Sequence, residues 1–149
     1  MNRVAILMVA AALGAGCTQM SHMMQGDSRM EHKSTGESVN LVGSNEVPAV
    51  TSSASGSGTV TVDHDRMVSA RITVTGMNAT AAHIHQGAPG SNGPVIVPFV
   101  KQGDNTFVAP PGAKMTEDQC RAYKSGNTYV NVHSAAHPGG EIRAQLRGD

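Results

Sequence analysis

The sequence predicts an all-β domain, an antiparallel Greek-key sandwich or barrel of about seven or eight strands with one short helix. Three observations support this fold class: short runs of alternating apolar and polar residues, turn residues between the runs, and one segment with helix boundary signals. The length of 149 residues suits a single domain. With 11 basic and 11 acidic side chains and 3% aromatic residues, the chain lacks the broad basic surface of a nucleic-acid-binding protein.

The clearest alternating runs are residues 59–63 and 68–74, and the short segment 64–66 between them predicts a hairpin. Further strands are expected at residues 81–86, 95–97, 105–109, 129–133 and 141–146. The run 95–97 reads Val-Ile-Val and is continuously apolar, which predicts a strand buried on both faces.

The helix is expected to begin after Thr116, a good N-cap residue, with Gln119 completing a capping box. Glu117 and Asp118 suit the positive end of the helix dipole, and Gly126 is a typical glycine beyond a helix C-terminus. Cys120 lies in this helix, where we expect a small buried hydrophobic residue.

Residues 1–16 are predicted to be a signal peptide, because a single Arg3 precedes an apolar run that is shorter than the roughly 20 residues a membrane span needs. The segment ending in Ala15-Gly16-Cys17 resembles the signal of bacterial lipoproteins. That resemblance implies a lipid on Cys17, anchorage in the cell envelope and, because Thr18 follows, the outer membrane, facing the periplasm or the surface. The alternative is an ordinary secretory signal with Cys17 as a bystander.

Residues 17–38 are polar and aperiodic, which predicts a flexible tether before a domain at 39–149. If Cys17 carries lipid, Cys120 has no partner for a disulfide. Thioether and imidazole side chains in the tether suit copper, although a Met-rich disordered tail is the alternative. These possible ligands are Met20, His22, Met23, Met24, Met30 and His32.

A His-x-His pair is the most informative local pattern. On a strand, His83 and His85 point to one face and Ile84 to the other, with the two Cβ atoms about 6.5–7 Å apart. Because metal–nitrogen bonds are about 2.0–2.1 Å long, both imidazoles can reach one ion. The pair is therefore a candidate bidentate metal clamp.

A second group follows near the C-terminus. Tyr129, Asn131 and His133 share one face of a predicted strand, and His137 lies in the turn before the last strand. If this strand neighbours the His-x-His strand, His133 supplies a third ligand and His137 a fourth. Such a set suits copper, with zinc as the alternative. Otherwise His133 and His137 bond backbone carbonyls at the turn.

Two polar residues, Glu141 and Asn131, are candidates for orienting these imidazoles from outside the ligand set. His64, beside two Asp residues in the hairpin, is expected to be solvated. The sequence contains neither a glycine-rich phosphate loop before a helix nor a G-x-S-x-G nucleophile motif, so an enzyme is the less favoured class.

Four motifs in order resemble the CHRD (chordin) domain. They are residues 41–50, 80–85, 93–97 and the pair 129–133 with 137–143, and together they span nearly all of 39–147. The family occurs in chordin, the secreted antagonist of bone morphogenetic proteins, and in many bacterial secreted proteins. The resemblance implies a domain type more firmly than an activity.

The His-x-His strand also resembles copper–zinc superoxide dismutase, a Greek-key barrel, and Arg143 near the histidines would attract a small anion. The chain lacks that family's disulfide, and the interval from His85 to Pro94 contains no further histidine.

Three hypotheses remain in order of preference: a copper-binding envelope lipoprotein, a non-catalytic scaffold with structural histidines and an envelope protein partner, and a dismutase-like redox enzyme.

Overall fold

The computed structural model describes residues 36–148. The predicted signal peptide, the lipidation site Cys17 and the tether ligand candidates (Met20, His22, Met23, Met24, Met30 and His32) lie outside the described residues. Within 36–148, no helix is both long and apolar enough to cross a membrane.

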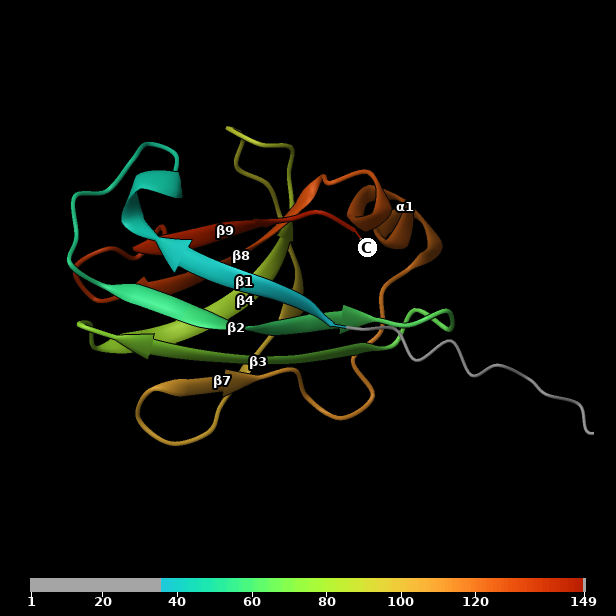
Figure 1. Cartoon of the computed structure of the whole chain (residues 1–149), viewed down its shortest axis with the longest axis horizontal. Helices are drawn as coiled ribbons and strands as arrows, with labels where there is room; N and C mark the ends of the chain where they lie inside the picture. The colour runs from blue at the N-terminus through green and yellow to red at the C-terminus, as the bar shows by residue number, and fades with distance from the viewer. Residues whose placement is uncertain (1–35, 149) are drawn as a thin grey trace, which may run out of the picture. The chain divides into compact units, whose positions relative to one another are not determined.

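The described residues form one antiparallel sheet of nine strands in the order β5-β4-β8-β9-β1-β2-β3-β7-β6 (Figure 1). The strands are β1 (Glu37–Val42), β2 (Ser55–Val62), β3 (Val68–Thr75), β4 (Ala79–Gln86), β5 (Val95–Pro98), β6 (Val100–Lys101), β7 (Thr106–Val108), β8 (Thr128–Ser134) and β9 (Ile142–Leu146). A 3-10 turn, η1 (Gly43–Asn45), follows β1, and the helix α1 (Glu117–Lys124) precedes β8. The all-β class with one short helix is confirmed.

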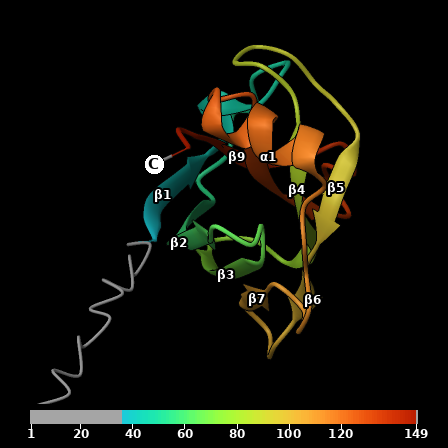
Figure 2. The same ribbon diagram turned by 90° about the vertical axis from the view of Figure 1, so that its right-hand side faces the viewer.

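One chain segment nearly closes this sheet into a barrel. β5 pairs with β4 at one end of the strand order, and β6, separated from β5 only by Phe99, pairs with β7 at the other end. The Phe99 amide donates to the Ala82 carbonyl at 3.0 Å, and Lys101 Nζ donates to the Ala79 carbonyl at 2.9 Å. Figure 2 shows β5 and β6 along the side where the two sheet ends approach. Closure of this kind removes exposed sheet edges.

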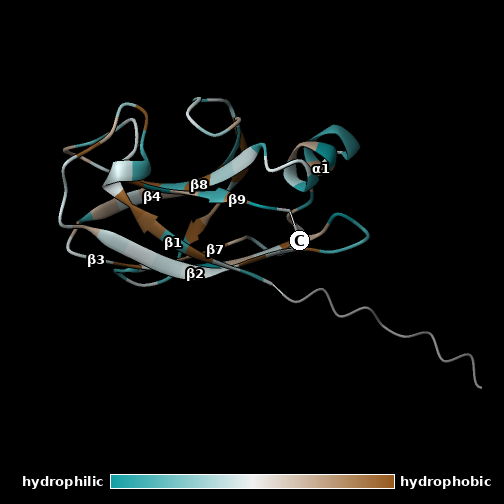
Figure 3. Cartoon of the chain, turned by 45° about the horizontal axis from the view of Figure 1, so that its top comes forward, coloured by the Kyte–Doolittle hydropathy of each residue, from teal (hydrophilic) through white to brown (hydrophobic). Residues whose placement is uncertain are grey.

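The core of the barrel consists of apolar residues from the alternating strands, and the brown segment of β1 in Figure 3 marks one of these hydrophobic stretches. The apolar residues with 0% exposure are Leu41, Val60, Ile72, Val74, Ala82, Ile84, Val130, Val132, Ile142 and Leu146. The predicted hairpin also forms, with Val62 opposite Val68 and the Met67 amide donating to the Asp63 side chain at 2.8 Å. The period of two therefore identified the buried face correctly.

The helix begins and ends as predicted. Thr116 and Gln119 form the reciprocal capping box, and Gly126 lies beyond the C-cap with φ +71°. Cys120 and Tyr123 on α1 are buried, which confirms the prediction for the cysteine.

One strand prediction was wrong. Residues 95–97 are not buried on both faces: β5 lies at an end of the strand order, and Val95 is 46% exposed while Val97 is 2% exposed. A strand that the sequence did not predict, β1, begins at Glu37, where it pairs with Val60 of β2. The buried Glu37 carboxylate also accepts the Arg147 amide at 2.8 Å.

Candidate metal centre

The two histidine-bearing strands are neighbours. β4 pairs with β8 in antiparallel register, with His83 opposite Asn131 and His85 opposite Tyr129. Ile84 of β4 is fully buried in the core. Because successive side chains alternate, the histidines lie on the sheet face turned away from that core. The condition for a shared site, that these two strands pair, is therefore met.

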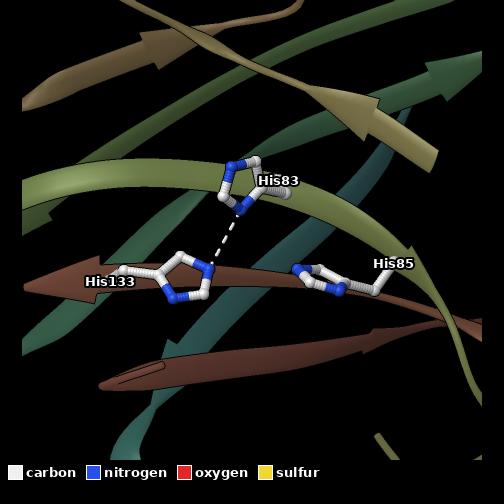
Figure 4. Close-up of side chains that lie close together, drawn as sticks. All are labelled: His83, His85 and His133. Atoms are coloured by element: carbon white, nitrogen blue, oxygen red, sulfur yellow. Dashed lines mark hydrogen bonds between the residues drawn. The ribbon is translucent and has the colours of Figure 1, made fainter. Parts of the chain in front are cut away.

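Three imidazoles gather on this face (Figure 4). One ring nitrogen from each of His83, His85 and His133 lies within 4.8 Å of the other two. His83 Nδ1 and His133 Nε2 are hydrogen-bonded at 3.0 Å. His83 and His133, which are 50 positions apart in the sequence, thus present ligand atoms to one small volume together with His85.

Backbone carbonyls fix the tautomers of two rings. His85 Nδ1 lies 2.9 Å from the Gly93 carbonyl and His133 Nδ1 lies 3.0 Å from the Pro138 carbonyl. A carbonyl only accepts, so both Nδ1 atoms carry the proton and both Nε2 atoms present a lone pair. His85 Nε2 is buried without a hydrogen-bond partner among residues 36–148. A metal ion is a natural partner for such an atom.

The electrostatic environment keeps these rings neutral. Burial, followed by the charges of His133 and His85, lowers the pKa of His83 to about 4. Burial also lowers the pKa of His85 and that of His133. Neutral imidazole is the form that binds metals, so the ligand atoms are available at neutral pH.

The cluster matches the dimensions of a metal site. Bonds of about 2.0–2.1 Å place tetrahedral nitrogen ligands about 3.3 Å apart. One pair of ligand atoms in the cluster is 3.0 Å apart, and the group extends to 4.8 Å. Small side-chain rotations would therefore bring the three rings around one ion, provided that the His83 proton moves to Nε2.

The lowered pKa values predict how the stability of the metal-free protein depends on pH. An unfolded histidine titrates near 6.5, so the unfolded chain takes up protons below about pH 6.5 while folded His83 stays neutral until about pH 4. The free energy of unfolding should therefore fall as pH decreases through this window. Urea titrations in the presence of a chelator, carried out at several pH values, measure this dependence. In a His83→Ala chain the free energy of unfolding should change less steeply with pH. Equal slopes for the two chains would contradict the assignment.

An aromatic and cationic stack holds His85 in place. The His85 ring lies parallel to the Tyr129 ring with centroids 4.9 Å apart, and the Arg143 guanidinium lies 3.4 Å from the centre of the Tyr129 ring. Arg143 is only 1% exposed and donates to the Ser91 carbonyl at 2.9 Å and to Asn92 at 3.1 Å. The expectation that Arg143 attracts anions from solvent is thus wrong, because its guanidinium is buried under the loop before β5.

Comparison with known proteins identifies the domain. A family model for the CHRD domain matches residues 38–146. The chain belongs to the CHRD domain family. No curated protein and no solved structure gave a significant match.

The other predicted site residues of the CHRD domain lie around the three histidines. Glu141 accepts from Ser134 and from Ser52, so its carboxylate is engaged with hydroxyl groups. The carbonyl of Pro138 orients His133 instead, so His133 makes the bond to a backbone carbonyl of the turn that the structural alternative expected. His137 does not contribute to the group of three ligand atoms. It lies on the turn before β9 and lines a cavity of about 400 Å³ with Glu46 and Gly140.

Gly140 of the CHRD domain allows this turn to lie against the site. Its φ is +132°, and an added Cβ would lie 2.6 Å from Asn131 Nδ2 and 2.6 Å from Glu46 Oε1. We expect Gly140→Ala to lower the free energy of unfolding by about 1–3 kcal/mol. Gly139→Ala is the matched control, because nothing lies within 4 Å of its added Cβ. Urea denaturation of both variants tests this, and equal losses would refute it.

Proposed function

We propose that this protein is a cell-envelope lipoprotein whose CHRD domain binds a transition-metal ion, copper by preference, through His83, His85 and His133. The observation that supports this most strongly is the convergence of one ring nitrogen from each of the three histidines within 4.8 Å. In addition, His85 Nε2 is buried without a hydrogen-bond partner in the described chain. The role we propose is non-catalytic: storage or buffering of copper, or tolerance to it.

Copper is preferred because of the ligand chemistry. Three imidazoles suit Cu(II) and Zn(II), and Cu(II) binds more tightly than Zn(II) to a given site of this kind. Hard ions such as Mg²⁺ and Ca²⁺ select oxygen ligands and would not be held by three nitrogens. Zinc remains the alternative ion, and the same site would hold it.

The anchor is a separate part of the proposal. We propose that Cys17 carries lipid and holds the domain at the envelope membrane, and that the Met and His residues of the tether capture or pass on Cu(I). A Cys17→Ala chain should then leave the membrane fraction and appear in the soluble fraction. Retention of this chain in the membrane fraction would contradict the lipid anchor without affecting the metal site.

The metal proposal is tested by stoichiometry. The full chain, purified without a histidine tag, is loaded with copper, freed of excess metal and measured by elemental analysis beside a His83→Ala/His85→Ala chain. We expect the double variant to hold one ion fewer per chain, while any tether binding is common to both. An unchanged stoichiometry would rule out the site.

A scaffold domain with structural histidines is the second candidate. It is favoured by the hydrogen bonds that these rings already make, at 3.0 Å between His83 and His133 and at 2.9 Å from His85 to the Gly93 carbonyl. Under this alternative the domain contacts another envelope protein. A structural His83 replaced by Ala would lower the melting temperature equally with and without chelator, whereas a ligand would give a larger difference when metal is present.

A further inference from the structure

Asn131 occupies the middle of the histidine cluster. It lies opposite His83 in the β4–β8 register, two residues before His133 on the same face of β8, and diagonal to His85. Its side chain is almost completely buried, with 2% exposure. A polar amide in such a position needs partners for its oxygen and its nitrogen.

The direction of the amide follows from its neighbours. Asn131 Nδ2 faces the Gly139 carbonyl at 3.5 Å, and the amide group also interacts with the Glu46 carboxylate. Both neighbours are acceptors, so they require the amide nitrogen on that side. The oxygen Oδ1 therefore points to the other side, where the histidines lie.

Two buried acceptor atoms are left facing the same place. Asn131 Oδ1 and His85 Nε2 are both buried and neither has a hydrogen-bond partner within 36–148. The two residues are near each other, because Asn131 is the diagonal cross-strand neighbour of His85 on the same face of the β4–β8 pair. Neither atom carries a proton when His85 Nδ1 donates to Gly93, so they cannot bond to each other. A buried acceptor without a partner is unfavourable, and one cation would satisfy both atoms.

We propose that Asn131 Oδ1 is the fourth ligand of the metal ion, which completes a site of three imidazole nitrogens and one amide oxygen. This inference rests on the proposed metal function and adds a residue and a selectivity to it. An amide oxygen is a hard ligand and stabilises a divalent ion more than Cu(I). The site in the barrel therefore prefers Cu(II) to Cu(I), and Asn131 is a residue that sets this preference.

The test compares Cu(II) and Cu(I) affinities of full-length chains, measured by competition with chelators in air and under reductant. Asn131→Leu keeps the approximate size of the side chain and removes both polar atoms, whereas Asn131→Asp keeps an oxygen ligand. Each affinity is compared with that of the His83→Ala/His85→Ala chain, because this chain retains any copper binding by the tether and so gives the background. Circular dichroism verifies that each variant is folded.

We expect Asn131→Leu to lower Cu(II) affinity about tenfold or more and to change Cu(I) affinity much less. A selective tenfold loss corresponds to a rise of about 59 mV in the Cu(II)/Cu(I) potential. Asn131→Asp should keep Cu(II) affinity at or above the level of the unmodified chain. Equal losses for both ions, or no loss for either, would overturn the role of Asn131.

The outcomes separate this inference from the function on which it rests. If the unmodified chain binds copper no better than the double histidine variant, the metal function itself fails. If the histidine variant loses copper but Asn131→Leu binds both ions like the unmodified chain, only the fourth ligand is refuted. If Asn131→Leu does not fold, the Asn131→Asp chain provides the test. This chain still has an oxygen ligand, so the proposal predicts that it keeps its preference for Cu(II), and loss of that preference would contradict the proposal.

Discussion

Replacing His133 by alanine is expected to lower the affinity of the protein for copper by about 100-fold or more, because even residues that only orient a metal ligand contribute roughly 10- to 100-fold. His133 Nε2 is one of three ligand nitrogens within 4.8 Å, and it lies on a different strand from the other two. The variant therefore tests whether β8 contributes to the site, which a variant in the His-x-His pair alone cannot do. Competition with a chelator of known affinity measures the loss.

His64→Ala is the matched control for this prediction. The His64 side chain is 85% exposed in the connection between β2 and β3, and its nearest charged partner is Asp65 at 3.2 Å. The same substitution there should leave copper affinity within experimental error. If His64→Ala and His133→Ala weaken binding alike, copper is held by scattered surface histidines and the cluster is not the site.

The largest effect on stability is expected from Arg143→Ala, about 3–5 kcal/mol, because the substitution removes a buried side chain and several hydrogen bonds of its charged group, each of which contributes roughly 1.5–3 kcal/mol. Arg143 is only 1% exposed, and its guanidinium is 3.4 Å from the centre of the Tyr129 ring. Its hydrogen bonds join β9 to the loop before β5, at 2.9 Å to the Ser91 carbonyl and 3.1 Å to Asn92. Removal also takes away the positive charge of Arg143, which opposes the rise that burial causes in the pKa of the Glu46 carboxyl group.

Arg121→Ala provides the control on the helix surface. Arg121 pairs with Glu117 at 3.0 Å and with Asp118, but its side chain is 64% exposed. Exposed pairs contribute roughly 0–1 kcal/mol, so the free energy of unfolding should hardly change. Urea denaturation of both variants measures the difference. A loss for Arg143→Ala as small as that for Arg121→Ala would show that the buried network is not a major source of stability.

Local patterns in the sequence predicted much of the fold. The alternation in residues 68–74 identified a strand whose inward residues Val68, Ile72 and Val74 are buried. The capping box at Thr116 located the start of α1 within one residue. The same period of two placed His83 and His85 on one face. These features depend on neighbouring residues alone, so the sequence contains the information directly.

Features that depend on strand order could not be predicted in this way. From the sequence alone, His133 joins the cluster only on the condition that its strand neighbours the His-x-His strand, and the β4–β8 pairing meets that condition. The apolar run 95–97 resembled a central strand, but β5 lies at an end of the sheet, where Val95 is 46% exposed. The burial of Arg143 likewise depends on a loop that folds over it. Such contacts arise from long-range closure of the barrel.

Sequence reasoning also missed part of the site's surroundings. Tyr129 was placed on the correct face of its strand, but its stacking on His85 and its contact with Arg143 were not anticipated. These contacts follow from the register of β8 with its two neighbours: Tyr129 lies opposite His85 of β4, and Asn131 lies opposite Arg143 of β9. A sequence without known strand order does not reveal that register.

The central claim is that imidazoles from β4 and β8 share one metal ion. Anomalous diffraction at the copper absorption edge, on crystals of the copper-loaded protein, tests it most directly. We expect a peak on the outer face of the β4–β8 pair, within bonding distance of His83 Nδ1, His85 Nε2 and His133 Nε2. Copper found elsewhere on the domain, with these three rings still hydrogen-bonded to each other and to the backbone, would contradict it.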